Sequence, residues 1–423
     1  MQTRSLLVAP LLALGALVVL PAPAAHAAGV LYASPSGVGL LDCGTPATAC
    51  NIEKAVGSAG AGDQVVLAPG TYATTTQLSN ANGIYLHGTA GQARPVISSN
   101  VAFPLQLSGD APGTPARVSD LSIVHSANAG QGLRVSSSGI VERVDVRSSS
   151  GTACEFALNN TVRDTLCVAT GADAIAISAG GSAGAMANLT WRLRNVTAIA
   201  TGPLGTGVAA SLSGGGKLTV DLRNVIASGG GEDIAASTPD ATTVTVVAQS
   251  SNYDKVTTSG AGTVTPAGSG TNQTAAPVFT DATTYHEAAT SPTVDAGTSD
   301  GYVGATDLDG QARLQGPAVD IGADETARPV PPPLDTAAPD TALGQTPKKR
   351  TTKRKARFTF TASEAGATFT CRVDKKAARP CTSPFTVKVR PGKHTLSVAA
   401  RDAAGNVDAT PATCTWKVRK KRR

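Results

Sequence analysis

Aromatic side chains are scarce in this chain of 423 residues, in which Phe, Trp and Tyr together make up 4%. A groove that stacks sugar rings or bases on aromatic side chains is therefore not predicted. Helical periodicity is almost absent as well. In residues 59–72, AGAGDQVVLAPGTY, a short apolar run lies between two clusters rich in Gly, Asp and Pro. Such runs recur between residues 29 and 325, and they exclude a helical bundle and predict many short strands.

Long hydrophobic runs are missing too, apart from residues 6–20 near the amino terminus. That run has about 15 residues, fewer than the ~20 that cross a bilayer. It follows a short basic start and precedes Ala25-His26-Ala27, whose small-x-small form suits signal peptidase. We therefore expect residues 1–27 to be a cleaved signal peptide, and a secreted protein without a later transmembrane segment.

The cysteines lack the CxxC spacing of zinc sites, and no His residue stands at a ligand spacing from them. Most of them instead form close pairs, which an oxidising compartment would close into small loops. The predicted disulfides are Cys43–Cys50, Cys154–Cys167 and Cys371–Cys381. Cys414 is left over, and it is either buried in the C-terminal domain or able to exchange with the neighbouring pair.

Negative charge is scarce from residue 335 onward, where 21 Lys and Arg stand against 6 Asp and Glu, a net charge of +15. Residues 28–334 have 14 against 24, a net charge of −10. We expect the basic part to bind wall polymers, anionic lipid headgroups or other extracellular polyanions. No nucleic acid is expected, because the basic stretches at residues 348–357 and 417–423 lack a known binding motif and the protein is exported. The alternative is a solvated charge run without a partner.

Similar segments recur after residue 118 at spacings of 23, 21, 31 and 29 residues. They are VSDLSIVHS, VERVDVRSS, VRDTLCVAT, LRNVTAIAT and LRNVIASGG, which begin at Val118, Val141, Val162, Leu193 and Leu222. Alternate positions of a strand share a face, so the apolar first, fourth and sixth positions would stack inside a β-solenoid. The wider spacings leave the register between residues 162 and 222 open, because they can hold an extra coil edge or an inserted loop.

The third position of each segment is polar and suits a bend before the strand. The residues at this position are Asp120, Arg143, Asp164, Asn195 and Asn224. Residues 51–59, NIEKAVGSA, form the one convincing short amphipathic helix, and we expect this helix to cap the open N-terminal end of the solenoid.

Four stretches carry a resemblance to known families. Residues 43–72, CGTPATACNIEKAVGSAGAGDQVVLAPGTY, resemble the N-terminal cap and first coil of right-handed parallel β-helix proteins of the pectin lyase-like class. Residues 291–297, SPTVDAG, and 307–325, DLDGQARLQGPAVDIGADE, resemble the ending of secreted bacterial β-helix proteins of the choice-of-anchor Q type. Residues 369–413 are similar to bacterial Ig-like modules that are appended to extracellular proteins.

The chain is therefore predicted to be all-β. We expect a right-handed parallel β-helix over residues 28–325, a Pro-rich linker over residues 326–340, and a small Ig-like β-sandwich with a basic tail over residues 341–423. The β-helix resemblance implies either a scaffold without activity or a polysaccharide lyase or glycoside hydrolase, since fold alone does not choose between them.

The enzymatic alternative requires charged residues on the outer face of the coils. A lyase needs carboxylates that hold Ca²⁺ against a uronate and a basic residue that removes a proton, whereas a hydrolase needs two carboxylates. Glu142, Asp145 and Arg163 are the candidates, because the register places them on neighbouring coils ~4.8 Å apart. The competing interpretation is an exposed cross-strand ion pair. Ca²⁺ is expected under the lyase alternative alone, and no other cofactor is predicted.

Two further features bear on function. An apolar stripe on the outer face is predicted to be covered by a loop or to form a contact surface; it consists of Leu166, Val168, Ile199 and Ile226. Residues 307–310, DLDG, lack the further acidic ligands of an EF-hand loop, so we expect Asx turns that close the last coil and no metal site. The sequence thus favours a secreted, surface-associated bacterial scaffold for adhesion or carbohydrate association.

Overall fold

The structure is a computed structural model that describes residues 28–39, 42–109, 113–182, 188–268, 270–327 and 335–420. The predicted signal peptide and the tail residues 421–423 lie outside this part of the chain. Two compact units divide between residues 328 and 329. Within the described residues, no helix is long and apolar enough to cross a membrane.

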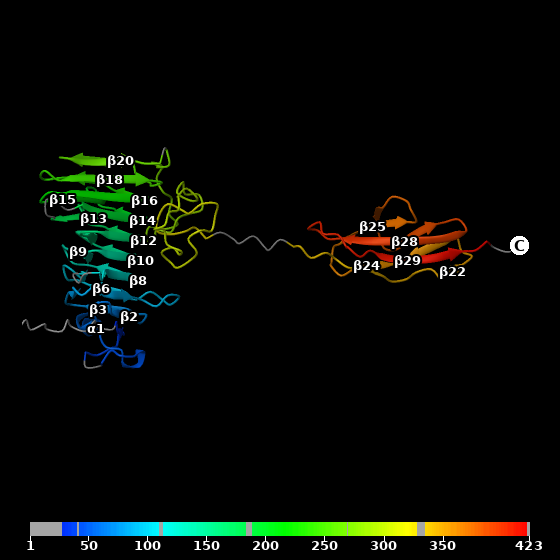
Figure 1. Cartoon of the computed structure of the whole chain (residues 1–423), viewed down its shortest axis with the longest axis horizontal. Coiled ribbons are helices and arrows are strands. Elements are labelled where there is room, and N and C mark those ends of the chain that lie inside the picture. Colours follow the sequence, from blue (N-terminus) through cyan, green and yellow to red (C-terminus); the bar gives the residue numbers. More distant parts are fainter. Residues whose placement is uncertain are drawn as a thin grey trace, which may run out of the picture. The chain divides into compact units, whose positions relative to one another are not determined.

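The first unit is a parallel β-helix in which an 8-stranded and a 12-stranded sheet rise side by side (Figure 1). The 8-stranded sheet contains β4 (Leu78–Asn80), β7 (Leu105–Leu107), β9 (Gln131–Val135), β11 (Thr152–Phe156), β13 (Ile175–Ser182), β15 (Thr206–Ser213), β17 (Glu232–Ser237) and β19 (Val256–Ser259). The 12-stranded sheet contains β1 (Val30–Ala33), β2 (Gln64–Leu67), β3 (Thr71–Thr74), β5 (Tyr85–His87), β6 (Val96–Ser99), β8 (Ala116–His125), β10 (Gly139–Ser148), β12 (Asn160–Ala169), β14 (Asn188–Ala200), β16 (Lys217–Gly229), β18 (Thr243–Gln249) and β20 (Gly262–Pro266).

The register of these strands confirms the predicted solenoid. Each first position pairs with the first position of the next coil, in the series Val118, Val141, Val162, Leu193 and Leu222, and all of these side chains are fully buried. The same register continues across the wider spacings. There β14 and β16 have 13 residues, whereas β12 has 10. Part of the extra length therefore extends the strands of the coil, and residues 183–187 lie outside the described residues.

The polar third position is the point at which each long strand bends. Its residues have positive φ angles between 51° and 55° throughout the series Asp120, Arg143, Asp164, Asn195 and Asn224. Asp and Asn tolerate this left-handed conformation better than most residues. In β8 the bend separates the part that pairs with β5 from the part that pairs with β6. In the coils with a long strand, two faces thus come from one bent strand, and the third face comes from the 8-stranded sheet.

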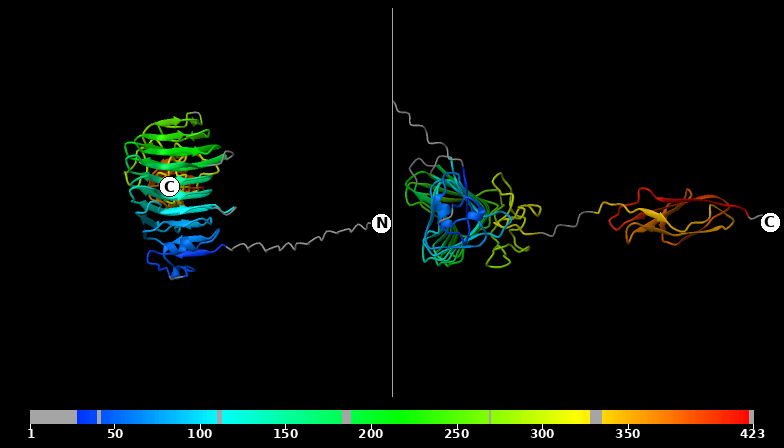
Figure 2. Two further views of the ribbon diagram at one scale, coloured as in Figure 1. Left: turned by 90° about the vertical axis from the view of Figure 1, so that its left-hand side faces the viewer. Right: turned by 90° about the horizontal axis from the view of Figure 1, so that it is seen from below.

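The N-terminal end of the stack is closed as the sequence predicts. Asn51 caps helix α1 (Ile52–Ser58) by accepting a hydrogen bond from the Lys54 backbone N–H at 3.0 Å. Ile52 and Val56 are buried against the first coils, and Figure 2 shows this helix in blue across the end of the stack. A short 3₁₀ helix, Pro46–Thr48, and the Cys43–Cys50 disulfide lie beside it.

The last regular strand of the stack is β20, and after it Gln273 still pairs in parallel with Asn252 on the coil below. Residues 270–327 add no further regular strand. They form a covering segment, which folds back along the side of the stack and is drawn in yellow in Figure 1. Isolated bridges such as Phe279↔Glu287 and Thr306↔Ala312 hold its turns. The predicted Asx turn is present within it, because Asp307 Oδ1 accepts the N–H groups of Asp309 and Gln311 at 3.1 and 2.7 Å.

The second unit is the small β-sandwich. Its strands are β21 (Thr341–Leu343), β22 (Arg350–Thr351), β23 (Lys355–Phe358), β24 (Phe360–Ala362), β25 (Thr368–Val373), β26 (Arg379–Cys381), β27 (Phe385–Lys388), β28 (Gly392–Arg401) and β29 (Ala412–Val418). A 5-stranded sheet in the order β22, β29, β28, β25, β26 packs over β23 and β27, with Trp416 and Phe358 buried between them. The Cys371–Cys381 disulfide joins β25 to β26, and the free Cys414 is half-buried against the same core.

Candidate functional site

The structure brings two of the three predicted catalytic residues together. Glu142 on β10 and Arg163 on β12 are register partners, and the Arg163 Nε donates to Glu142 Oε2 at 2.7 Å. Arg143 donates to the other oxygen, Glu142 Oε1, at 3.3 Å. Glu142 is 7% exposed, so two guanidinium groups satisfy a nearly buried carboxylate. This arrangement holds Glu142 as the acceptor of an ion-pair network.

Asp145 is not part of that network. It lies beyond the bend at Arg143, and its carboxylate pairs with Arg147 on the same strand at 3.0 Å. Burial raises the pKa of Asp145, and Arg147 partly offsets that effect. Glu142, Asp145 and Arg163 therefore do not form one cluster. Glu142 and Arg163 form an ion pair between coils, and Asp145 forms a separate pair with Arg147.

The predicted apolar stripe is covered by a loop. Of the two interpretations, a covering loop and a contact surface, the structure shows the first. Leu166, Val168, Ile199 and Ile226 pack under the covering segment against Tyr285, Leu308, Ile321 and Ala323. Ile226 and Ile321 are both fully buried. The outer face beyond the bend on β12, β14 and β16 therefore belongs to the protein interior and offers no open surface to a polymer.

Ion pairs fasten the covering segment to the coils. Arg313 donates to Asp164 on β12 at 2.7 Å, and Asp300 accepts from Arg194 on β14 at 2.8 Å. The amide nitrogen of Asn224 donates to the Thr298 carbonyl at 2.8 Å. Asp164 and Asn224 are two of the residues with positive φ angles at the bends of the long strands. The bends are therefore also points at which the covering segment is attached.

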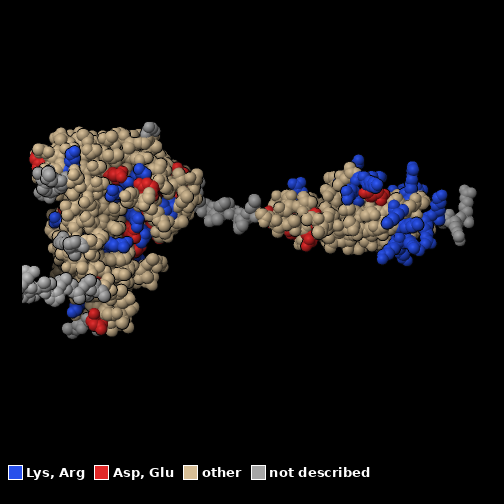
Figure 3. Space-filling model, viewed as in Figure 1, with Lys and Arg blue, Asp and Glu red and all other residues tan. Residues whose placement is uncertain are grey.

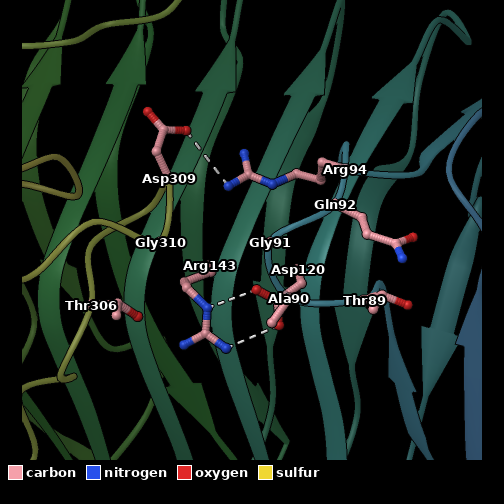
Figure 4. A pocket seen from close by; sticks show the side chains of 10 residues that line it. All are labelled: Thr89, Ala90, Gly91, Gln92, Arg94, Asp120, Arg143, Thr306, Asp309 and Gly310. Carbon is pink, nitrogen blue, oxygen red and sulfur yellow. Dashed lines mark hydrogen bonds and ion pairs between the residues drawn. The ribbon is translucent and has the colours of Figure 1, made fainter.

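A pocket of about 380 Å³ opens where the covering segment meets the bends of the coils. Its walls come from the β5–β6 loop, the bend residues Asp120 and Arg143, and the turn at residues 306–310 (Figure 4). Arg143 binds Asp120 through two hydrogen bonds of 2.7 and 2.9 Å. On the opposite side, Arg94 lies 3.7 Å from Asp309 and donates to the Leu308 carbonyl.

The pocket is polar and close to charge-balanced, with two guanidinium groups and two carboxylates in its lining. Burial of Asp120 raises its pKa, but the hydrogen bonds from Arg143 and Ser119 outweigh that effect and leave the pKa below the usual value. Donors and acceptors therefore face one another across the pocket. A hydroxyl-rich ligand matches this chemistry better than an apolar one.

Sequence reasoning missed this pocket. Arg94 and Leu308 are 214 positions apart, and neither belongs to the repeats. The DLDG stretch could be identified in the sequence. Nothing in the sequence indicated that Arg94 would lie beside it.

Exposed cations gather at one end of the sandwich (Figure 3). This basic end consists of Lys348, Lys349, Arg350, Lys353, Arg354, Lys355, Lys388, Arg390, Lys393, Lys417, Arg419 and Lys420. Asp374 lies beside it, where its carboxylate bonds His394 Nδ1 at 2.8 Å and the Thr395 N–H at 2.9 Å. The acidic group next to the basic end is therefore already engaged within the sandwich.

The strand register places like charges directly opposite one another at this end. Arg350 pairs with Lys417 on the neighbouring strand, and Lys417 pairs with Lys393 on the next. On the other sheet Lys355 faces Lys388. Like charges in register destabilise a sheet, so these pairs oppose folding unless an anion lies over them.

No family model matches the chain, and no curated protein matches it. Among solved structures, the crystal structure of pectate lyase Pel9A is similar, with a TM-score of 0.38 and 14% sequence identity. The similarity covers 70% of this chain and 96% of that chain. At this level the similarity decides neither the site nor the activity.

Proposed function

We propose that the protein is an exported, non-catalytic scaffold whose basic sandwich attaches it to an anionic extracellular or envelope polymer. The like-charged register pairs of the basic end carry this proposal. A row of cations across three adjacent strands costs stability in the free protein, and repeated anionic groups would offset that cost. The partner is thus a polymer with regularly spaced carboxylates or phosphates.

The β-helix supports the scaffold part of the proposal. Its candidate carboxylates are held by Arg side chains, and the covering segment lies over one outer face. The remaining feature, the polar pocket at Arg94 and Arg143, suits a hydroxyl-rich ligand such as a sugar. The signal peptide expected at residues 1–27 and the three disulfides fit an oxidising compartment outside the cytoplasm.

The test is binding of the full chain without residues 1–27 to three polymers: polygalacturonate, poly(glycerol phosphate) and neutral dextran. We expect binding to the two anionic polymers that weakens as NaCl rises, because exposed charges are screened. Stronger binding to one of them would identify carboxylate or phosphate as the recognised group. Dextran should not bind to the basic end.

Two double variants with equal charge removal make the test specific. Lys393→Gln with Lys417→Gln removes cations from the basic end, and at about 1 kcal/mol for each cation near an anionic surface the affinity should fall about thirtyfold. Arg379→Gln with Arg401→Gln removes exposed cations elsewhere in the sandwich and should change the affinity little. The first variant should unfold no more easily than the wild type, since it relieves a like-charge pair. Equal losses in both variants, or equal binding to dextran, would overturn the proposal.

A further inference from the structure

A His and two Asp residues converge on the outer side of the covering segment. The nitrogen of His286 and the carboxylate oxygens of Asp309 and Asp324 all lie within 4.8 Å of one another. His286 Nε2 and Asp309 Oδ2 are 2.7 Å apart. The side chains of His286 and Asp309 are 39% and 35% exposed, so the cluster is open to solvent on one side, whereas Asp324 is only 7% exposed.

Backbone hydrogen bonds hold each of the three residues in place. The His286 carbonyl accepts the Thr280 N–H at 2.8 Å in a small hairpin. Asp309 stands in the Asx turn, in which the Gly310 N–H donates to the Asp307 carbonyl at 3.1 Å. Asp324 follows Ala323, whose carbonyl accepts the Leu308 N–H at 2.9 Å. The three side chains are therefore positioned by folded turns, and little ordering is left for a ligand to impose.

The buried carboxylate of Asp324 has one backbone hydrogen bond and no ion pair with Lys or Arg within the described residues. The Glu287 N–H donates to its Oδ2 at a long 3.3 Å, and across the described ranges no Lys or Arg forms an ion pair with it. Arg313 donates to the Asp324 backbone carbonyl and not to its carboxylate. A carboxylate that is more than nine-tenths buried is costly when it is charged and has no cation beside it.

The surroundings add to this excess of negative charge. Three further carboxyl groups, those of Asp307, Asp320 and Glu325, are buried in the covering segment, and Arg313 lies 3.7 Å from Glu325. Near the surface, Arg94 lies 3.7 Å from Asp309 Oδ1, which leaves Oδ2 directed at His286. A cation bound between the three side chains would offset the unpaired charge of Asp324.

We propose that His286, Asp309 and Asp324 form a binding site for a divalent transition-metal cation, for which Zn²⁺ is the reference. Imidazole and carboxylate are both common Zn²⁺ ligands, and three protein ligands with an open position are typical of zinc sites that bind water or a substrate. Tetrahedral ligands at ~2.1 Å from Zn²⁺ lie ~3.4 Å from one another. The His286–Asp309 separation of 2.7 Å needs only a small opening to reach that value. Asp309 also lines the polar pocket, so the open position would be next to it.

The first measurement is calorimetric titration of the chelator-treated full chain, without residues 1–27, with ZnCl₂ and separately with CaCl₂. We expect one Zn²⁺ per chain and weaker Ca²⁺ binding, because Ca²⁺ prefers six to eight oxygen ligands. Binding should weaken at acidic pH, since protons compete with the metal for its ligands. A Co²⁺-loaded sample should show visible absorption bands that report the same ligands.

Matched variants separate this site from other candidates. His286→Ala and Asp309→Asn should each weaken Zn²⁺ binding at least tenfold. Loss of a residue that only supports a metal ligand costs ~10–100-fold in affinity, so loss of a ligand should cost no less than the lower end of that range. His394→Ala is the control, because His394 forms a similar 2.8 Å pair with Asp374 but has no third ligand. Glu364→Gln tests the all-carboxylate group of Asp335, Glu364 and Asp402. Asp309 is partly exposed, so its Asn variant should keep the circular dichroism spectrum of the wild type.

Three results would overturn the metal site. They are no Zn²⁺ binding by the wild type, unchanged binding by both site variants, and loss of binding in His394→Ala or Glu364→Gln instead. A plain His–Asp ion pair gives the first of these results, and adventitious binding elsewhere gives the other two.

Discussion

The Arg313 guanidinium donates a 2.7 Å hydrogen bond to Asp164 Oδ1 across 149 positions of sequence, and the two side chains are 3% and 0% exposed. Arg313 also donates to the carbonyl groups of Gly322, Ala323 and Asp324. One side chain thus joins β12, at its left-handed bend, to the turns of the covering segment. The attachment of this segment depends on a charge pair that solvent does not reach.

Arg313→Ala should destabilise the first unit by about 3–5 kcal/mol, because removing one member of a buried pair leaves the other charged and unpaired. Urea unfolding followed by Trp191 fluorescence in a Trp416→Phe background reports this unit alone, since the sequence has two Trp residues. Arg401→Ala, at an exposed position of the sandwich, should shift that transition by less than about 0.5 kcal/mol. A small effect of Arg313→Ala would mean that the covering segment does not depend on the pair.

The stability of the first unit should decrease as the pH rises from about 4.5 to about 9. Burial raises the pKa of Glu287 from 4.5 to about 9, so in this range the folded state keeps a proton that the unfolded state releases. The free energy of unfolding then falls by up to about 1.4 kcal/mol per pH unit for that proton. Glu287→Gln carries no titrating proton and should flatten the pH profile in chelator-containing buffer. A profile with an unchanged slope would show that Glu287 ionises normally.

Removal of the Cys154–Cys167 disulfide should lower the stability of the first unit by about 3 kcal/mol, given its sequence separation of 13. The bond joins β11 to β12 inside the stack, and both sulfurs are fully buried. Cys154→Ala with Cys167→Ala should therefore shift the Trp191 unfolding transition, whereas Cys414→Ser should leave it in place. If the double variant unfolds like the wild type, the loop closed by this bond is already ordered before folding.

No product should form when the full chain without residues 1–27 meets polygalacturonate or neutral polysaccharides, with or without Ca²⁺. Glu142 is engaged by Arg163 and Arg143, and Asp145 by Arg147, so no free pair of carboxylates faces a substrate there. Reducing-end release and the ultraviolet absorbance of unsaturated products measure turnover. Turnover that Glu142→Gln or Arg163→Ala abolishes would refute the scaffold proposal. Glu155→Gln, from a similar ion pair with Arg134 on the other sheet, is the control and should leave any turnover unchanged.

The coil interior was predictable because its signal is local and repeated. The fourth and sixth positions of the repeats alternate as strand residues must, the first position is apolar in every repeat, and the structure stacks all three coil upon coil. The register across the wider spacings could not be fixed from the sequence, since strand lengthening and loop insertion give the same spacing. The lengths of β14 and β16 show that longer strands account for part of the wider spacing.

The site residues were only partly predictable, because they depend on contacts between distant segments. Glu142 and Arg163 follow from the register, but Asp145 turns to Arg147, which the column pattern does not encode. His286 and the DLDG turn were visible in the sequence as separate features. Their meeting depends on how the covering segment folds back, and this segment has no repeat from which a register could be inferred.

The covering segment also fixes the order in which the first unit can be completed. Its residues bond strand residues that lie 74 to 149 positions earlier, as the pairs Asn224–Thr298 and Asp164–Arg313 show. During synthesis from the amino terminus, β12, β14 and β16 therefore emerge before the residues that bury Leu166, Ile199 and Ile226. Until then the nascent stack presents a bare apolar face, and slow, non-local contacts of this kind delay folding and favour aggregation. A chaperone that recognises this face would protect the chain in the interval before residue 325 arrives.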